Sequence, residues 1–339
     1  MHEALFYQQL EEGKVACGLC HHRCHIGTGK RGLCGVRENR DGRLVSLVYG
    51  MLVSQNVDPI EKKPMFHFLP GSRSYSIATV GCNFHCRHCQ NYQISQYPHF
   101  HAGAIAGTAT TPAEVVAAAR RTGCASISYT YVEPTIFYEF AYDCAKLAKE
   151  QGLGNVFVSN GYMTAEVVHH LAPVLDGINI DLKGFTDEFY RQVCKARLAP
   201  VLENIRLFHK LGVLVEVTTL LIPGLNDSDG ELRAIARFLK DISPDMPWHV
   251  TGFYPTYAMM DRPPTPAATL SKAREIGLGE GLHFVYEGNV AGSGGEDTHC
   301  PACGALLVQR QRFGSQVVGM RGDRCFGCGA AIAGVWGVA

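Results

Sequence analysis

The arrangement of the cysteines constrains this chain more than any other feature. Eleven of the 14 cysteines in 339 residues fall into three short groups. Their spacings are C-x2-C-x3-C-x9-C, C-x3-C-x2-C, and two CxxC pairs separated by 21 residues. The groups are Cys17, Cys20, Cys24 and Cys34; Cys82, Cys86 and Cys89; and Cys300, Cys303, Cys325 and Cys328. Chance would give about 0.6 CxxC pairs at this frequency, and the chain has four, so the grouping indicates metal binding.

Composition and charge limit the classes of protein that this chain can belong to. With 46% hydrophobic residues it can bury a large core, and 31 basic against 31 acidic residues exclude a globally basic nucleic-acid binder. The first 14 residues lack the basic and apolar regions of a secretory signal, and the longest apolar stretch (44–53) is about half of a membrane span. We therefore expect a cytoplasmic protein with no membrane partner. In a reducing compartment, clustered cysteines bind metals rather than form disulfides.

The third cysteine group has the spacing of a zinc ribbon, in which two CxxC turns supply four thiolates. We expect a zinc-ribbon-like module over residues 296–339, in which zinc holds together a tail too small for its own core. Between Cys300 and Cys328, four arginines against one aspartate make this tail mildly basic, which leaves a docking role open.

The first group predicts a second metal-binding module, over residues 1–55. Its four cysteines are interleaved with His21, His22 and His25. Structural zinc, an auxiliary iron–sulfur cluster and mixed Cys/His ligation all fit this spacing. The segment is basic as well.

The second group supplies only three thiolates, and a [4Fe–4S] cluster normally takes four. An apolar run from Tyr75 to Val80 leads into a Gly-Cys turn, so the loop follows a strand. Three ligands leave one iron open, as a catalytic metal keeps one position for substrate. A zinc or redox loop is the ordinary alternative. The C-x3-C-x2-C motif after a first strand resembles the radical S-adenosylmethionine (SAM) superfamily, in which SAM chelates the open iron.

Strands and helices alternate through the middle of the chain. We expect strands near residues 75–80, 126–131, 156–159, 178–183, 213–222 and 248–254, with amphipathic helices such as 112–123 and 135–152 between them. This alternation predicts an α/β fold with a parallel sheet, whose function lies at the carboxyl ends of the strands. We expect a partial (βα)6 TIM-like barrel over residues 70–295.

Polar residues follow several of these strands. Each has an ordinary structural explanation: a helix cap, a turn, a strand-end salt bridge or a buried core histidine. Together, in order behind the cysteine loop, they predict one site at the mouth of the sheet. These residues are Glu133, Ser159, Asn160, Asp181, Lys183 and His249.

The longest resemblance is to the AmmeMemoRadiSam system radical SAM enzymes, relatives of the pyruvate formate-lyase activating enzymes. It spans nearly the whole chain. The matching stretches include CGLCHHRCHIGTGKRGLCGVREN, GCNFHCRHCQN, SYTYVEPTIFYE, VSNGYMT, INIDLKGFTDEFY, EVTTLLIPGLND, WHVTGFYP and the C-terminal CPACG…CFGCG.

The resemblance implies roles for individual residues. Cys82, Cys86 and Cys89 would ligate the [4Fe–4S] cluster. Glu133 resembles the last residue of the family's GGE element, which receives the SAM amino group, although Tyr131-Val132 replaces the two glycines. Ser159 and Asn160 resemble contacts to the SAM ribose and carboxylate, and Val158 stands where the activating enzymes have a cation-binding Asp. Asp181, Lys183 and His249 resemble catalytic residues that line the cofactor and control radical formation, with Asp181 also contacting SAM.

The expected function is reductive cleavage of SAM at the cluster to a 5′-deoxyadenosyl radical, which abstracts hydrogen from a protein or small-molecule substrate. Activation of a glycyl radical enzyme is the alternative within this class. A zinc-dependent nucleic-acid-binding or scaffold protein is the alternative from another class, and nucleic-acid binding is not favoured. The implied cofactors are a [4Fe–4S] cluster, SAM and zinc. The implied partners are a reductant such as flavodoxin or ferredoxin, and the Memo-like and AMMECR-like proteins.

Overall fold

The computed structural model describes residues 2–289 and 294–337. Its centre is an eight-stranded sheet with the order β16-β15-β14-β13-β12-β11-β9-β8. Seven of these strands are parallel and follow one another in chain order, while β8 pairs with β9 antiparallel. The strands are β8 (Ser54–Pro59), β9 (Arg73–Ala78), β11 (Ser126–Tyr129), β12 (Gly154–Ser159), β13 (Gly177–Asp181), β14 (Leu214–Leu221), β15 (Trp248–Gly252) and β16 (Val285–Gly288). The predicted α/β fold is confirmed, whereas closure into a partial barrel stays a prediction.

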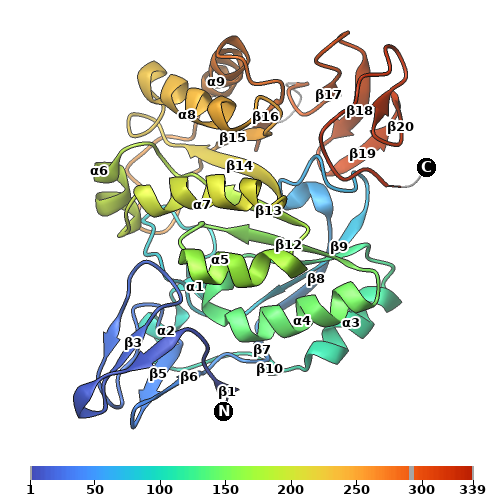
Figure 1. Cartoon of the computed structure of the whole chain (residues 1–339). Coiled ribbons are helices and arrows are strands. Elements are labelled where there is room, and N and C mark those ends of the chain that lie inside the picture. The colour runs from blue at the N-terminus through green and yellow to red at the C-terminus, as the bar shows by residue number, and fades with distance from the viewer. Residues whose placement is uncertain (1, 290–293, 338–339) are drawn as a thin grey trace.

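The parallel strands are buried, as expected for a sheet covered by helices. All four residues of β11 are buried, and so are the first four of β13. Helices return the chain between strands, and Figure 1 shows several of them side by side in front of the sheet. They are α3 (Pro112–Arg121), α4 (Tyr138–Glu150), α5 (Ala165–Leu171), α7 (Ala199–Lys210), α8 (Asp229–Ile242) and α9 (Ala267–Gly279).

Helix starts follow from local sequence. Thr111 caps α3 in a capping box: its hydroxyl accepts from the Glu114 amide, and the Glu114 carboxylate accepts from the Thr111 amide at 2.7 Å. Pro112 takes the first helical position, where its missing N–H costs nothing. In the second predicted helix, residues 134–137 form a 3₁₀ turn before α4 begins at Tyr138.

The N-terminal region forms two small antiparallel sheets that pack against the lower part of the main sheet in Figure 1. The strands are β1 (His2–Glu3), β2 (Tyr7–Gln9), β3 (Val15–Cys17), β4 (His25–Ile26), β5 (Arg37–Arg40) and β6 (Arg43–Ser46). Two more short strands, β7 (Met51–Leu52) and β10 (Thr108–Ala109), pair with each other. The hydrophobic core of the sheet continues into this region and includes Val15, Ile26 and Leu44.

The C-terminal region has a separate hydrophobic core. It is built from β17 (Thr298–His299), β18 (Leu306–Gln311), β19 (Gly314–Val317), β20 (Met320–Arg321) and β21 (Arg324–Cys325). Leu307 and Val308 pack there with Phe66 and Tyr286 from the main body. The ring of His67 contacts the Ala333 carbonyl and the Tyr286 hydroxyl, each at 2.7 Å.

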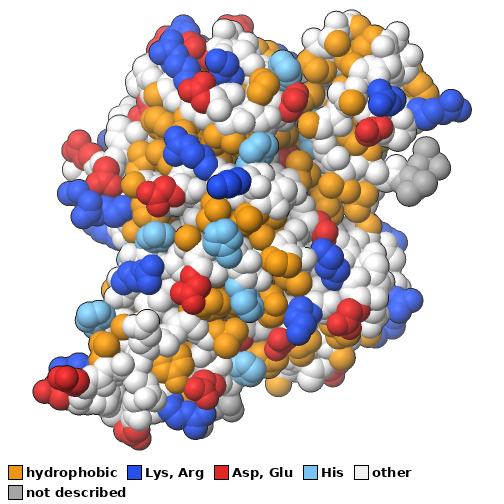
Figure 2. All heavy atoms as spheres, viewed as in Figure 1, with side chains coloured by type: hydrophobic (Ala, Val, Ile, Leu, Met, Phe, Trp, Pro, Cys, Tyr) orange, Lys and Arg blue, Asp and Glu red, His pale blue; other side chains and the backbone are white. Residues whose placement is uncertain are grey.

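Among the described residues, no helix combines the length and the apolar character needed to cross a membrane. On the face that Figure 2 shows, lysines and arginines are interspersed with aspartates and glutamates. This face therefore presents no broad field of positive charge of the kind that binds a phosphate backbone.

Candidate active site

The cysteines of the second group lie on the loop that follows β9, which we call the cluster loop (residues 81–91). Gly81 opens it with φ +99°, and a Cβ there would lie 2.6 Å from Val36 Cγ1, so glycine is required. Further along, the His85 amide donates to the Cys194 carbonyl at 3.1 Å. The loop is thus held between the N-terminal region and residues 190–194.

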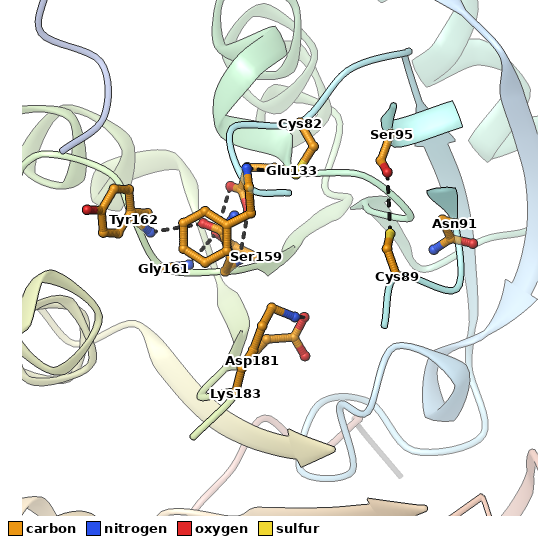
Figure 3. A network of polar contacts seen from close by, with 12 residues as sticks. Cys82, Cys89, Asn91, Ser95, Glu133, Ser159, Gly161, Tyr162, Asp181 and Lys183 are labelled. Atoms are coloured by element: carbon orange, nitrogen blue, oxygen red, sulfur yellow. Dashed lines mark hydrogen bonds and ion pairs between the residues drawn. The ribbon is translucent and has the colours of Figure 1, made fainter. Parts of the chain in front are cut away.

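The three thiols of the cluster loop interact electrostatically in every pair. Burial raises the pKa of the Cys82 and Cys89 thiols, and a hydrogen bond with Cys194 together with burial raises that of Cys86. Cys89 Sγ also lies 3.3 Å from Ser95 Oγ (Figure 3). Because thiolates are the metal-binding form, cluster assembly here must release protons.

Glu133 follows β11 and forms hydrogen bonds with residues at the end of β12. It is 3% exposed. One carboxylate oxygen accepts from the Thr135 amide at 3.1 Å and from Ser159 Oγ at 2.8 Å, and the other accepts from the Asn160 amide at 2.7 Å (Figure 3). Burial raises the pKa of Glu133 against the opposing effect of these hydrogen bonds. Glu133 therefore both caps the following turn and positions Ser159 and Asn160.

A pair of asparagines joins β12 to the cluster loop. Asn160 Nδ2 donates to Asn83 Oδ1 at 2.7 Å, and Asn160 Oδ1 accepts from the Tyr162 amide at 3.1 Å. Asn83 follows Cys82 directly and is buried. Asn83 was not predicted from the sequence, although its place directly after the first cysteine was a usable signal.

Tyr131 adopts the backbone conformation that glycine favours. Its φ is +65°, in the left-handed region. Asn91 Nδ2 donates to its carbonyl at 2.8 Å, its hydroxyl donates to Asp58, and Lys63 Nζ lies 4.4 Å from its ring centre. The tyrosine thus keeps a left-handed turn of the kind that glycine favours, at a cost of about 1–3 kcal/mol.

Asp181 and Lys183 form an ion pair at the end of β13, with 2.9 Å between Nζ and Oδ2 (Figure 3). The Lys183 amide donates to the Tyr190 hydroxyl at 3.1 Å. Burial opposes the charge on Lys183, but Asp181 and the nearby cysteines raise its pKa well above the usual range. Lys183 therefore stays a cation beside the cluster loop.

His249, in β15, is held by a carboxylate from the neighbouring strand. Its Nε2 lies 2.7 Å from Glu216 Oε2, and both groups are buried. Glu216 also accepts from the amides of Phe66 and His67 at 3.0 and 2.8 Å. Burial opposes ionisation of Glu216, but the hydrogen bond and charge of His249 lower its pKa. Glu216 was not predicted from the sequence, because it lies inside a strand.

One cavity of about 580 Å³ brings these residues together. Its lining includes every cluster-loop cysteine and every strand-end residue predicted from the sequence. These residues are Cys82, Cys86, Cys89, Glu133, Ser159, Asn160, Asp181, Lys183 and His249. Among the residues that line the cavity, none belongs to the first or third cysteine group.

The cavity fits a [4Fe–4S] cluster with SAM. Both ring nitrogens of His88 and Thr218 Oγ1, in the lining of the cavity, are buried without a hydrogen-bond partner among the described residues. Burial and the charge of Lys183 lower the pKa of His88 to about 3, so its neutral ring offers one donor and one acceptor. Buried polar atoms without partners are uncommon and point to a ligand. Three thiolates can hold a cluster with one open iron, and the volume suits a cofactor-sized molecule.

The third cysteine group fits a metal ion such as zinc. Its four sulfurs all lie within 4.8 Å of one another. Cys300 and Cys328 are 3.6 Å apart, and Cys303 and Cys325 are 3.7 Å apart. Four thiolates around one tetrahedral zinc ion would be about 3.8 Å apart, given Zn–S bonds of about 2.3 Å.

The first cysteine group is also brought together, at a distance from the cavity. Each of its four thiols interacts electrostatically with the other three. No histidine joins it in a tight set: His25 is exposed, and His22 Nε2 lies 2.7 Å from the Asn83 carbonyl oxygen.

Comparisons with known proteins point to one superfamily. A family model described as the Radical SAM superfamily matches residues 76–239. An uncharacterized protein of Methanocaldococcus jannaschii is 47% identical over 335 residues, which are 98% of this chain and 99% of that protein. A second protein of that organism, provisionally named a glycyl-radical enzyme activating enzyme, is 26% identical over 61% of this chain and 78% of its own length. The crystal structure of Streptococcus suis SuiB bound to S-adenosylmethionine has the same fold, with a TM-score of 0.50 at 10% identity, over 68% of this chain and 53% of that one.

Proposed function

The chain belongs to the radical SAM superfamily, and we propose that it cleaves SAM reductively to abstract hydrogen from a protein or small-molecule substrate. One observation carries the proposal: the three cluster-loop thiols, five polar side chains at strand ends and His249 of β15 line the same cavity. When bound, the reduced cluster and SAM supply a 5′-deoxyadenosyl radical that takes a hydrogen atom from the substrate. The residues of the chain hold, orient and shield these groups.

The residues at the ends of β11 and β12 form the binding side of the site. Glu133, Ser159 and Asn160 would contact the amino, ribose and carboxylate groups of SAM. Glu133 already accepts hydrogen bonds from Ser159 and from the Asn160 backbone, so it also sets the position of both. Since Asn160 bonds to Asn83 of the cluster loop, a shift of either loop would move the other.

Charged residues on the other side of the cavity would control radical formation. Lys183, kept cationic by Asp181, would stabilise the negative charge of the cluster thiolates. Glu216 fixes the ring of His249 against the wall of the cavity, where it would contact cofactor or substrate.

We propose that the radical SAM core carries two further metal-binding modules, one at each end of the sequence. We assign residues 1–55 to an N-terminal metal module, residues 70–295 to the radical SAM core and residues 296–339 to a zinc-ribbon-like module. β8 lies between the first two and completes the edge of the sheet. A flavodoxin or ferredoxin would supply electrons, and the resemblance supports Memo-like and AMMECR-like proteins as partners.

Anaerobic reconstitution tests the proposed activity. The protein reconstituted with iron and sulfide should show a [4Fe–4S] spectrum and, with dithionite and SAM, release 5′-deoxyadenosine. Cys82→Ala should abolish release, whereas Cys124→Ala, at a buried cysteine outside the cavity, should retain it. A colourless, zinc-only protein with salt-sensitive RNA affinity would contradict the proposal and favour the nucleic-acid-binding alternative.

The class of substrate is a separate question. The similarity to a protein named as an activating enzyme supports testing a protein substrate first. If a glycyl radical enzyme is the substrate, incubation with it should give the EPR doublet of a glycyl radical. If SAM is cleaved but no such signal forms with any glycyl radical enzyme of the source organism, activation of this class is excluded.

A further inference from the structure

The first cysteine group, which we call the N-terminal four-thiol group (Cys17, Cys20, Cys24 and Cys34), shares the core of the catalytic unit. Two of its members, Cys17 and Cys34, belong to the hydrophobic cluster that also contains Cys86, and the other two pack against it. In the third group, the C-terminal four-thiol group, Cys300 and Cys325 belong to a different hydrophobic cluster, and Cys303 and Cys328 are exposed. The N-terminal group is therefore structurally continuous with the cluster loop, and the C-terminal group is not.

Thiol spacing also separates the two four-thiol groups. Among the described residues, the C-terminal group is the only set of three or more Cys, His, Asp or Glu residues whose ligating atoms all lie within 4.8 Å of one another. In the N-terminal group no three thiols are that close, yet every pair interacts electrostatically. The cluster-loop thiols are likewise not a set within 4.8 Å of one another, and they also interact electrostatically in every pair.

The distance between the sulfurs of a group limits whether it can bind a single metal ion or an iron–sulfur cluster. A single ion draws all four sulfurs to one centre, so they must lie close together. A cubane cluster binds each thiolate through a different iron, so the sulfurs lie farther apart. Among the described residues, neither the N-terminal group nor the cluster loop has three thiols as close together as those of the tight C-terminal group.

A buried cation accompanies the N-terminal thiols. Arg37 is 1% exposed and pairs with Glu139 at 2.9 Å. Its charge interacts with Cys17 and Cys34. The Nε of Arg37 is buried with no hydrogen-bond partner among the described residues. A buried cation with an unpaired donor in this module suits an anionic cluster, whose sulfurs accept hydrogen bonds.

The N-terminal group touches the cluster loop on two sides. His22, inside the group, has its Nε2 2.7 Å from the Asn83 carbonyl oxygen. On the other side, a Cβ on Gly81 would lie 2.9 Å from the Cys34 carbonyl oxygen. Gly81 and Asn83 are the two neighbours of Cys82. The segments that carry the two sets of thiols are thus in direct contact.

We propose that the N-terminal four-thiol group binds a [4Fe–4S] cluster that passes single electrons to the cluster held by Cys82, Cys86 and Cys89. A one-electron donor of the flavodoxin or ferredoxin class is oxidised and reduces the N-terminal cluster from 2+ to 1+. Transfer to the second cluster returns the first to 2+, and no covalent bond or proton is exchanged. The electron acceptor rests on the proposed function, whereas the identity of the N-terminal metal can be tested independently of it.

A variant without the catalytic cluster tests the identity of the metal. The full chain carrying Cys82→Ala, Cys86→Ala and Cys89→Ala is reconstituted anaerobically with ferrous iron and sulfide in the presence of equimolar zinc. We expect about four irons per chain and, after dithionite reduction, a [4Fe–4S] EPR signal that SAM does not alter. Zinc in the N-terminal group with no iron would overturn the proposal. Because this variant lacks the catalytic cluster, the result does not depend on SAM cleavage.

A second variant tests the electron transfer. In Cys20→Ser, release of 5′-deoxyadenosine with reduced flavodoxin should fall more than about tenfold, a barrier increase above about 1.4 kcal/mol, whereas release with dithionite should hardly change. Cys24→Ser, at a partly exposed position, replaces it if Cys20→Ser does not fold. Cys124→Ser is the matched control and should behave as the wild type with both donors. Electron transfer through the N-terminal cluster would be ruled out if release of 5′-deoxyadenosine fell equally with flavodoxin and with dithionite. It would also be ruled out if release fell with neither reductant.

Discussion

The two four-cysteine modules look alike in sequence but are attached to the protein in different ways. The N-terminal module shares the main hydrophobic core, and its buried Arg37 forms an ion pair with Glu139 of α4. The C-terminal module packs in a second hydrophobic cluster that also contains Phe66, Phe284 and Tyr286 of the main body, and its buried Arg310 donates to the Phe66 carbonyl at 2.8 Å. Cysteine spacing alone therefore does not reveal how a metal module is joined to the catalytic core: Glu296, Arg312 and Phe313 of the C-terminal module line the cavity, whereas none of the lining residues belongs to 1–55.

The largest expected effect comes from Arg37. Arg37→Met leaves the buried carboxylate of Glu139 without its partner, which typically costs about 3–5 kcal/mol. Because the N-terminal module shares the main core, we expect the free energy of unfolding of the main sheet to fall, measured by denaturant unfolding. The double variant R37M/E139L should recover part of the loss, since both buried charges are then gone. A loss confined to residues 2–52 by hydrogen exchange would contradict the shared core.

The attachment of the C-terminal module should depend on pH through His67. Burial lowers the pKa of His67 to about 4, below the ordinary value of about 6.5. Between these values the unfolded chain binds a proton that the folded chain does not, so this contribution to stability is complete above pH 6.5 and is lost as the pH falls toward 4.

The loss should reach about 3 kcal/mol at pH 4, at about 1.4 kcal/mol per pKa unit. Thermal unfolding of the wild type and of His67→Gln at several pH values measures it. The variant should show a flatter acid dependence. Parallel curves for the two proteins would show that His67 does not carry this effect.

The smallest of these effects should come from Arg310. Arg310→Met leaves the carbonyls of Phe66 and Glu296 and the hydroxyl of Thr298 without their donor, at about 1–3 kcal/mol. The guanidinium also lies 4.2 Å from the centre of the Phe66 ring. We expect faster hydrogen exchange in β17 and β18 with little change in the main sheet. Equal destabilisation of both regions would contradict the separate attachment of this module.

Much of the fold followed from the sequence because strands buried between helices are apolar and regularly spaced. All six predicted strands are present, and membership of the radical SAM class, with its cluster and SAM, is confirmed. β8 (SQNVDP) was missed because this edge strand has exposed polar residues, and β16 (VYEG) because it is short. The roles of the individual site residues stay predictions.

The residues that meet in the site could be predicted from the sequence only where the parallel arrangement of the strands brings them together. Parallel strands bring their carboxyl ends to one edge, so Glu133, Ser159 and Asp181 could be expected to meet. Contacts such as that of Asn83 with Asn160, 77 positions apart, depend on side-chain directions that no local pattern encodes. The same holds for the distances between thiols, which distinguish the two four-thiol groups.

Metal analysis of the full wild-type chain tests this distinction most directly. The protein is reconstituted anaerobically with ⁵⁷Fe, sulfide and zinc, and its iron and zinc are counted alongside Mössbauer spectra. We predict two [4Fe–4S] clusters, about eight irons, and one zinc ion per chain. One cluster and two zinc ions per chain would contradict the account and make both modules zinc-binding.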